Sequence, residues 1–330
     1  MRVLALLNGY RPPDENEFVF RQVRSLEKSG VKISKIYCGR GASPRDFFRS
    51  LGCIIKTCMT TKPDLIHCHF GSITSLLGVI ASLTFNIKLV VTFRGSDLAG
   101  VYVNYKRIKT LSKISVFISK FCAIFADQII VVSRELFQDL PKRCQEKATI
   151  IPTGIPLETF YPMGRELARQ ALGISNAKKI ILCDAHSPTK NVKLAEAVFL
   201  HVKAYRPDVE LIVLKDTPPS KVPLFLNAAD VLLYTSFREG SPNIVKEAMA
   251  CNLPVVSVKC GDVEERLDGV FPSKVLPPDT DLLASAVCEV LDLNIRSNGR
   301  EKISEISEDK IALKIKEVYF KALTTSLSRA

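Results

Sequence analysis

The sequence predicts an α/β protein built from two doubly wound, Rossmann-like domains. Short β-branched runs alternate with segments of helical periodicity along the chain, which is the pattern of a parallel sheet with crossover helices. The pattern is interrupted at residues 152–162, which hold three prolines and a glycine, and then restarts. At 330 residues the chain is long enough for two domains.

The first domain, residues 1–162, is expected to form a strand wherever a short apolar run is bounded by polar or turn residues. Between the first two runs lies an amphipathic helix, residues 18–28, with Phe18, Val23 and Leu26 on one face and charged residues on the other. The expected strands are residues 3–7, 31–37, 65–67, 89–92, 128–132 and 149–151.

The second domain, residues 163–310, repeats this alternation of strands and helices. A C-terminal helix, within residues 311–330, is expected to pack back on the first domain. Because ligands bind at the carboxyl ends of the strands in open parallel sheets, we expect the two domains to face a central cleft. The expected strands of the second domain are residues 179–183, 210–214, 229–234 and 253–258.

The positive charge of the chain is concentrated in its first half. Residues 1–162 hold 23 basic and 12 acidic residues, a net of +11, whereas residues 163–330 hold 23 and 22, a net of +1. An electropositive half predicts an anionic partner, such as a lipid surface or a phosphorylated substrate. Nucleic acid is not expected, because neither paired finger ligands nor an aromatic RNA-binding signature accompanies the charge.

Cysteine usage and the N-terminus predict a cytoplasmic protein. The ten cysteines are scattered, and none forms a CxxC pair, so we expect reduced core thiols. A strand-like run directly follows Met1 and Arg2, which leaves no room for a signal-peptide core. The apolar stretches also fall short of the ~18 residues of a spanning helix. Any membrane contact is therefore expected to be peripheral, at the inner face of the membrane.

The segment 229–256 holds the strongest candidate site. It reads as a buried strand, a tight polar turn, a helix starting near Pro242 and a second buried strand. The loop leaves backbone N–H groups free at the positive end of a helix, which suits a phosphate group. Glu239 and Glu247 flank this helix start and could bind the hydroxyls of a sugar. A capping role for Glu239 and an ion pair for Glu247 explain the same pattern.

This segment resembles the retaining, nucleotide-sugar-dependent glycosyltransferases of family 4, which have the two-domain GT-B fold. Glu239 and Glu247 match the Glu-x7-Glu pattern of that family, and further ordered matches cover most of the chain. They are residues 65–71 (LIHCHFG), 91–97 (VTFRGSD), 126–133 (ADQIIVVS) and 150–160 (IIPTGIPLETF).

The resemblance implies transfer of a sugar from a nucleoside diphosphate to an acceptor hydroxyl, with retention at the anomeric carbon and no essential metal or other cofactor. It implies that Glu239 contacts the hydroxyls of the donor sugar, Glu247 the ribose and Lys190 the diphosphate. Arg94 joins Glu239 and Lys190 as an expected catalytic residue. The other expected site residues are Gly240, Ser241, Pro242, Asn243 and Ile244 for the donor, and Asn8, Gly9, Arg94 and Asp97 for the acceptor.

The sequence departs from the family pattern at four places. Residues 183–186 stand where the family has a Gly-Arg pair, so the diphosphate clamp is absent, and Arg94 stands where the family has a histidine. A guanidinium at this position could still bind phosphate or sugar hydroxyls. The N-terminal glycine-rich loop is replaced by the acidic residues 11–17, and the region that contacts the base is cut short at residues 211–230.

No metal site is expected. His67 and His69 could suggest a metal pair, but neighbouring residues of a strand point to opposite faces and no third ligand lies nearby.

Residues 103–125 combine basic and apolar side chains at helical spacing. Such a helix can lie on anionic lipid, with each basic residue adding about 1 kcal/mol. Alternatively its apolar face packs on the sheet and its basic face is solvated. We expect membrane association, and an acceptor that is a lipid-linked glycan or a lipopolysaccharide or exopolysaccharide precursor. The basic residues are Lys106, Arg107, Lys109, Lys113 and Lys120.

Two alternatives remain at this point. One is a nucleotide-sugar epimerase of GT-B fold, which needs no acceptor. The other is a degenerate, non-catalytic glycosyltransferase-like scaffold, which the missing arginine and the missing glycine-rich loop favour. The intact Glu239–Glu247 block favours an enzyme.

Overall fold

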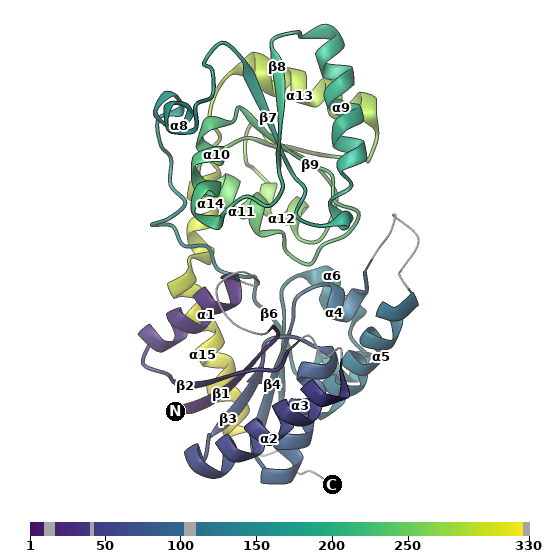
Figure 1. The fold of residues 1–330 in the computed structure, drawn as a ribbon, viewed down its shortest axis with the longest axis vertical. Coiled ribbons are helices and arrows are strands. Elements are labelled where there is room, and N and C mark those ends of the chain that lie inside the picture. Colours follow the sequence, from purple (N-terminus) through teal and green to yellow (C-terminus); the bar gives the residue numbers. More distant parts are fainter. Residues whose placement is uncertain (10–16, 40–42, 102–109, 326–330) are drawn as a thin grey trace. The chain divides into compact units, whose positions relative to one another are not determined.

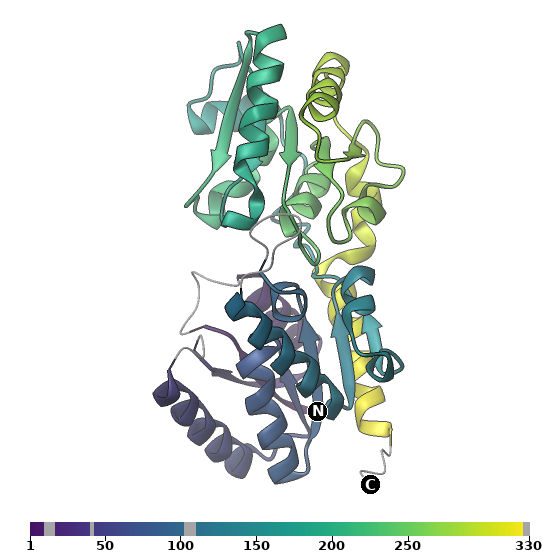
Figure 2. The same ribbon diagram turned by 90° about the vertical axis from the view of Figure 1, so that its right-hand side faces the viewer.

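The computed structural model describes residues 1–9, 17–39, 43–101 and 110–325, and these form two compact α/β units (Figures 1 and 2). The first unit takes in the described residues up to Gly154 together with those from Glu308 onward, and the second unit spans Ile155 to Ser307. The chain therefore changes unit after Gly154 and after Ser307, rather than at residues 162 and 310.

The first unit contains a six-stranded parallel sheet in the order β2-β1-β3-β4-β5-β6. The strand order reverses between β1 and β3, which is the switch point where open α/β sheets bind ligands. The strands are β1 (Arg2–Leu7), β2 (Lys32–Tyr37), β3 (Leu65–Cys68), β4 (Lys88–Phe93), β5 (Gln128–Val131) and β6 (Ala148–Ile150).

Helices cover both faces of this sheet. The connection from β1 to β2 runs opposite to the later ones, so right-handed crossovers place α1 on one face and α2, α3 and α5 on the other (Figure 1). Helix α15 lies beside α1 and packs on β4 and β5. The helices of this unit are α1 (Glu17–Lys28), α2 (Pro44–Thr61), α3 (Ser72–Phe85), α4 (Ser96–Ala99), α5 (Thr110–Phe125), α6 (Arg134–Asp139), α7 (Lys142–Gln145) and α15 (Glu308–Thr324).

The second unit contains a five-stranded parallel sheet in the order β11-β10-β9-β7-β8, with its switch point between β7 and β9. Its strands are β7 (Lys179–Asp184), β8 (Val209–Leu214), β9 (Val231–Tyr234), β10 (Val255–Val258) and β11 (Lys274–Leu276). Its helices are α8 (Arg165–Leu172), α9 (Val192–Tyr205), α10 (Val222–Ala228), α11 (Asn243–Ala250), α12 (Val263–Leu267), α13 (Thr280–Leu293) and α14 (Gly299–Ile303), with the 3₁₀ turns η1 (Pro188–Lys190), η2 (Pro219–Lys221) and η3 (Ser304–Ile306).

The expectation of two doubly wound domains is confirmed, and one strand was missed. Strand β11 is only three residues long and each of them is partly exposed, so it lacks the apolar run that marked the other strands. Helix α11 begins at Asn243, with Pro242 as its N-cap, as expected from the proline.

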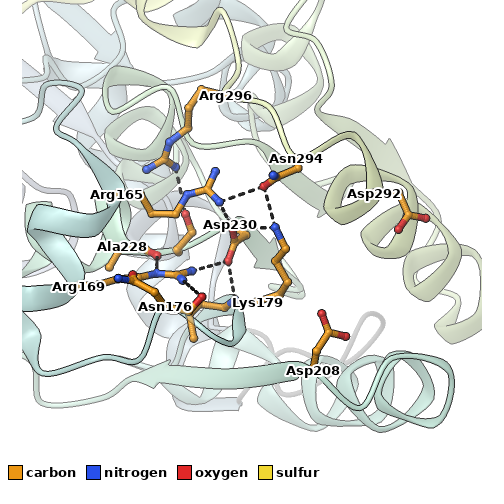
Figure 3. A network of polar contacts seen from close by, with 12 residues as sticks. Arg165, Arg169, Asn176, Lys179, Asp208, Ala228, Asp230, Asp292, Asn294 and Arg296 are labelled. Carbon is orange, nitrogen blue, oxygen red and sulfur yellow. Dashed lines mark hydrogen bonds and ion pairs between the residues drawn. The ribbon is translucent and has the colours of Figure 1, made fainter.

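A buried aspartate ties the amino ends of β7 and β9 together (Figure 3). The Asp230 carboxylate accepts hydrogen bonds from Arg165 Nη1 at 2.6 Å, from Arg169 Nη2 at 2.7 Å and from the backbone N–H of Ile180 at 2.6 Å. Lys179 Nζ lies 3.9 Å away. Since this network is at the amino edge of the sheet, opposite the ligand-binding edge, we interpret it as structural.

Candidate functional site

Four side chains of the second unit meet at the β7/β9 switch point, and two of them, Lys190 and Glu239, were predicted. Lys190 Nζ donates to Glu239 Oε1 at 2.8 Å and lies 3.1 Å from Asp184 Oδ2. It also donates to the hydroxyl of Tyr234 at 3.0 Å. Asp184 ends β7 and Glu239 follows β9, so neighbouring strands bring the two carboxylates to one ammonium group.

The charges of this cluster stabilise one another. Burial disfavours the charged form of Lys190, but Tyr234 and the two carboxylates favour it, and the pKa of Lys190 is raised well above its usual value. Burial also disfavours the charged form of Asp184, yet the hydrogen bond from His186 and the charge of Lys190 lower its pKa to about 2. Lys190 is therefore a permanent cation between two carboxylates.

The loop from Glu239 to Pro242 is held from the side by Gly261, which follows β10. At Gly261 the backbone φ is +55°, and a Cβ there would lie 2.5 Å from Gly240 O and 2.8 Å from Glu239 O. A side chain at residue 261 would therefore push against the main chain of the loop. Because Gly261 has no Cβ, the loop can lie close to it, and this position of the loop also places Glu239.

Ser241 connects this loop to a buried polar chain that sequence reasoning missed. Lys246, on α11, is fully buried, and its Nζ donates to Ser241 Oγ at 2.9 Å. Ser241 Oγ donates to Asp262 Oδ2 at 2.8 Å, and Arg266 Nε donates to the same oxygen at 2.9 Å. The sequence did offer a signal for the burial of Lys246, because most of its neighbours on α11 are apolar.

Two buried oxygens near the start of α11 have no hydrogen-bond partner among the described residues: Asn243 Oδ1 and Asp262 Oδ1. The helix also lacks a side-chain N-cap bond at Pro242. Ile244 and Glu247, which were also predicted, are 8% and 9% exposed. Buried polar atoms of proteins are normally paired, so this helix start suits a ligand that offers hydroxyl donors to the oxygens and an anion to the helix.

The first unit has a pocket of about 350 Å³ at its own switch point. Asn8 after β1, Phe70 and Gly71 after β3, and Asp97 after β4 contribute to its wall. Gly9, expected beside Asn8, forms a bridge to Gly39 through two backbone hydrogen bonds of 3.2 and 3.1 Å. Five residues with hydroxyl groups also line the pocket, together with Gly39, Ile73 and Val101; they are Ser72, Thr74, Ser96, Ser112 and Ser115. Such a wall suits a sugar.

Asp97 has a structural task at the edge of this pocket. Its carboxylate accepts hydrogen bonds from the backbone N–H groups of Gly71, Arg94 and Gly95 at 2.9, 3.0 and 2.9 Å. It thereby fixes the ends of β3 and β4 by capping the loop that follows β4.

Arg94 is held by neutral groups. Its Nε donates to the carbonyl of His69 at 3.0 Å, Nη1 donates to Thr153 Oγ1 at 3.2 Å, and Nη2 donates to Gln22 Oε1. The guanidinium also lies 5.2 Å from the ring centre of Phe18. Burial lowers the pKa of Arg94 to about 10, so it stays charged at neutral pH. It is not among the residues that line the pocket.

The expectation that strand alternation separates the two histidines was wrong. The ring centres of His67 and His69 lie 3.9 Å apart with the rings tilted by 33°, because residues two apart in an extended chain share a face. His67 Nδ1 pairs with the hydroxyl of Tyr319 at 2.6 Å and Nε2 with Thr92 Oγ1 at 2.7 Å. Within the described ranges, no group of three or more His, Cys, Asp or Glu side chains could hold a metal ion.

Helix α5 presents an apolar stripe to solvent. Ile114, Phe117, Phe121 and Phe125 are 61%, 72%, 48% and 38% exposed. We call these four residues the α5 stripe. Lys113 and Lys120 belong to the same helix, whereas Lys106, Arg107 and Lys109 lie outside the described residues. No helix in the described part of the chain has both the length and the apolar character to cross a bilayer.

Helix α2, in the same layer of helices, also exposes apolar side chains: Phe48 at 68% and Met59 at 64%. Arg45, Arg49 and Lys56 are exposed on the same helix. Monomeric soluble proteins rarely expose large apolar groups in clusters, so this layer is a candidate contact surface.

Comparison with known proteins places both units in glycosyltransferase families. Residues 3–159 match the family described as Glycosyltransferase Family 4, and residues 178–293 match the family described as Glycosyl transferases group 1. One relative is the "Putative teichuronic acid biosynthesis glycosyltransferase TuaC" of Bacillus subtilis, 26% identical over 242 residues. That match covers 68% of this chain but only 60% of TuaC.

The fold is also that of solved glycosyltransferase-type structures. Sucrose-phosphate synthase from Thermosynechococcus elongatus has a TM-score of 0.80 at 16% identity, covering 97% of this chain and 98% of the other. HepE of Anabaena, solved in complex with UDP-glucose, has a TM-score of 0.71 at 17% identity, covering 97% and 99%. At these identities the likeness concerns the fold.

Proposed function

Because the chain is a glycosyltransferase of the GT-B, family 4 type, we propose that it moves a sugar from a nucleoside-diphosphate sugar to an acceptor hydroxyl, with retention at the anomeric carbon. The observation that carries the donor assignment is the meeting of Lys190, Glu239 and the start of α11 at the β7/β9 switch point. This arrangement places a cation, a carboxylate and free helix N–H groups where such sheets bind ligands.

The proposed reaction breaks the bond between the anomeric carbon and the diphosphate oxygen. The acceptor oxygen forms the new bond to that carbon, and the acceptor's hydroxyl proton leaves with the diphosphate. Negative charge develops on the diphosphate, so groups already aimed at that position stabilise the transition state. We assign this task to Lys190 and the N–H groups of α11, with no essential metal or other cofactor.

Glu239 is the proposed partner of the donor sugar's hydroxyls, and Glu247 the proposed partner of the ribose. The unpaired oxygens of Asn243 and Asp262 support a ligand with hydroxyl donors. Gly240, Ser241, Pro242 and Ile244 complete the proposed donor loop.

The proposed acceptor is a lipid-linked glycan or a lipopolysaccharide or exopolysaccharide precursor, held at an anionic membrane surface. The hydroxyl-lined pocket at Asn8 and Asp97 supports a sugar at the acceptor end. Exposed apolar and basic side chains on α2 and α5 support a peripheral contact with lipid. In this proposal Arg94 has a supporting role: its hydrogen bonds to His69, Thr153 and Gln22 hold together the segments beside the acceptor pocket.

The donor assignment is tested by titrating the purified protein with UDP-, GDP- and ADP-glucose in a calorimeter. One of them should bind, and Lys190→Ala should weaken that binding, because it removes the cation from the site. Lys193→Ala, an exposed lysine on α9, is the matched control and should bind as the unchanged protein does. Release of nucleoside diphosphate only when a lipid-linked acceptor is added separates a transferase from an epimerase. If none of the three nucleotide sugars binds, the result would support the alternative of a non-catalytic scaffold.

A further inference from the structure

His186 is held on one side and open on the other. It lies between β7 and η1, and its Nδ1 is 2.6 Å from Asp184 Oδ1. Its backbone N–H donates to the same oxygen at 3.1 Å. The side chain is 44% exposed, and Nε2 has no partner within the described residues. The ring is thus oriented by Asp184 and free to bind a ligand through Nε2.

The carboxylate that orients His186 also binds Lys190. Asp184 Oδ1 accepts from His186, while Asp184 Oδ2 lies 3.1 Å from Lys190 Nζ. Since Lys190 is part of the proposed donor site, His186 stands at the edge of that site. Because Nδ1 carries a hydrogen in this arrangement, Nε2 is an acceptor in the neutral ring and becomes a donor when the ring is protonated.

The charge around Lys190 does not suit a diphosphate as it stands. Lys190 contributes one positive charge, and Glu239 and Asp184 contribute two negative charges. An anionic ligand would therefore meet a net negative cluster. A protonated His186 would remove this excess and supply an N–H donor at the same time.

We propose that His186, in its protonated form, is a ligand of the donor diphosphate in this chain. The proposal rests on the proposed function, because it takes the β7/β9 switch point as the donor site. It assigns Asp184 as a positioning residue, which acts through His186 and Lys190 without touching the donor.

The charged groups that face His186 agree with a proton at this site. The hydrogen bond to Asp184 raises the pKa of His186 most, burial and Lys190 oppose that effect, and Asp216 beyond β8 supports it. The pKa of His186 is raised overall. The histidine is consequently protonated below that pKa, and the predicted donor affinity is lost as the pH rises through it.

The test is the pH dependence of binding of the sugar nucleotide that binds best among UDP-, GDP- and ADP-glucose. Their diphosphates are esterified at both ends and do not themselves titrate near neutral pH. We expect the dissociation constant to rise about tenfold between pH 6 and pH 8.5, the effect of losing a charge-assisted hydrogen bond. Calorimetry in buffers of different ionisation enthalpy should also show proton uptake on binding.

Variants show whether the pH dependence of binding comes from His186 or from another titrating group. His186→Gln should bind weakly at pH 6 and lose both the pH dependence and the proton uptake, whereas His186→Arg should bind at pH 8.5 about as well as the unchanged protein does at pH 6. His201→Gln is the matched control, because His201 lies on α9 and pairs with Asp281 at 3.2 Å.

Two results overturn the inference in different ways. If His186→Gln keeps the pH dependence and the proton uptake, another group titrates and His186 is not the ligand, while the donor site stands. If no sugar nucleotide binds the unchanged protein at any pH, the proposed function fails together with the inference.

Discussion

His67 shows how one side chain joins distant parts of the first unit. It is fully buried, and both ring nitrogens pair with hydroxyl groups, one from Thr92 on β4 and one from Tyr319 on α15. Burial, with the charge of Arg94, lowers the pKa of His67 to about 3, so the ring is neutral. His67 is therefore a neutral, fully paired structural residue.

Removing the Tyr319 hydroxyl should be costly. Tyr319→Phe leaves a ring nitrogen of His67 buried without a partner, and we expect the free energy of unfolding of the first unit to fall by about 1–3 kcal/mol. Urea unfolding followed by circular dichroism measures this change. Tyr205→Phe is the control, since Tyr205 is 74% exposed, and it should change stability little. Equal stabilities for the two variants would mean that the His67 bond contributes nothing.

At the scale of single residues, the sequence identified candidate site residues better than it identified the residues that they contact. It selected Lys190 and Glu239, which the structure places in contact. It could not foresee that Asp184 would share Lys190, because that contact depends on which strands become neighbours. For Arg94 it expected a ligand-binding fork, and the structure shows the fork occupied by main-chain and side-chain groups of the same unit.

At the scale of secondary structure elements, the same hydrogen-bonding arrangement occurs before three strands. Asp64, Asp127 and Asp230 each stand just before a strand and accept the backbone N–H of the neighbouring strand, at 2.7, 2.8 and 2.6 Å. Each carboxylate also pairs with Lys or Arg side chains. An aspartate directly before an apolar run is visible in the sequence, and it marks the amino edge of these sheets.

Asp127 and Asp230 of this set are buried, and Asp230 should matter most because its carboxylate pairs with two arginines. Asp230→Asn leaves Arg169, only 3% exposed, without its anion, and we expect unfolding of the second unit to become easier by about 3 kcal/mol. Asp292→Asn is the control in the same region, because its carboxylate is 71% exposed and such surface pairs are worth less than about 1 kcal/mol (Figure 3). Chemical denaturation of the two variants compares them directly.

The loop between β9 and α11 depends on a neighbour without a side chain. Gly261→Ala combines a positive φ with a Cβ that would press on Gly240 O, so Glu239 should be displaced. We expect sugar-nucleotide affinity to fall about tenfold or more, since small displacements of positioning groups have large effects.

A glycine in open space supplies the contrast. Gly52, on α2, has no atom within 4 Å of an added Cβ, so Gly52→Ala should stabilise the protein by about 0.5–1 kcal/mol and leave binding unchanged. Unaltered affinity in Gly261→Ala would show that the loop can move without losing its ligand.

Burial explains which strands could be predicted from the sequence and which could not. Strands such as β1 and β4, buried along nearly their whole length, were expected within a residue or two. Strand β11 pairs only with β10 at the edge of its sheet and is partly exposed, so no apolar run marked it. The switch points themselves follow from strand order, which periodicity does not determine.

At the scale of the whole molecule, charge and exposed apolar groups point to the same partner. The net charge of +11 over residues 1–162 favours an anionic surface, and the α5 stripe offers groups that can enter the lipid interface.

We therefore expect the protein to sediment with vesicles that contain anionic lipid and less with vesicles of neutral lipid, and added salt should weaken the binding. Phe117→Asp should reduce the sedimented fraction strongly. Phe320→Asp is the control, because Phe320 is 51% exposed on α15, over the other face of the sheet. Equal loss in both variants would argue against α5 as the contact.

The return of α15 to the first unit also sets an order of folding during synthesis on the ribosome. Residues 155–307 complete the second unit before the ribosome reaches Glu308. Until then, β4 and β5 lack the helix that covers them, and His67 lacks Tyr319. Domains usually fold in the order in which they are made. Here the half that begins the chain is the last to be finished, and a nascent chain should acquire protease resistance in its second unit first.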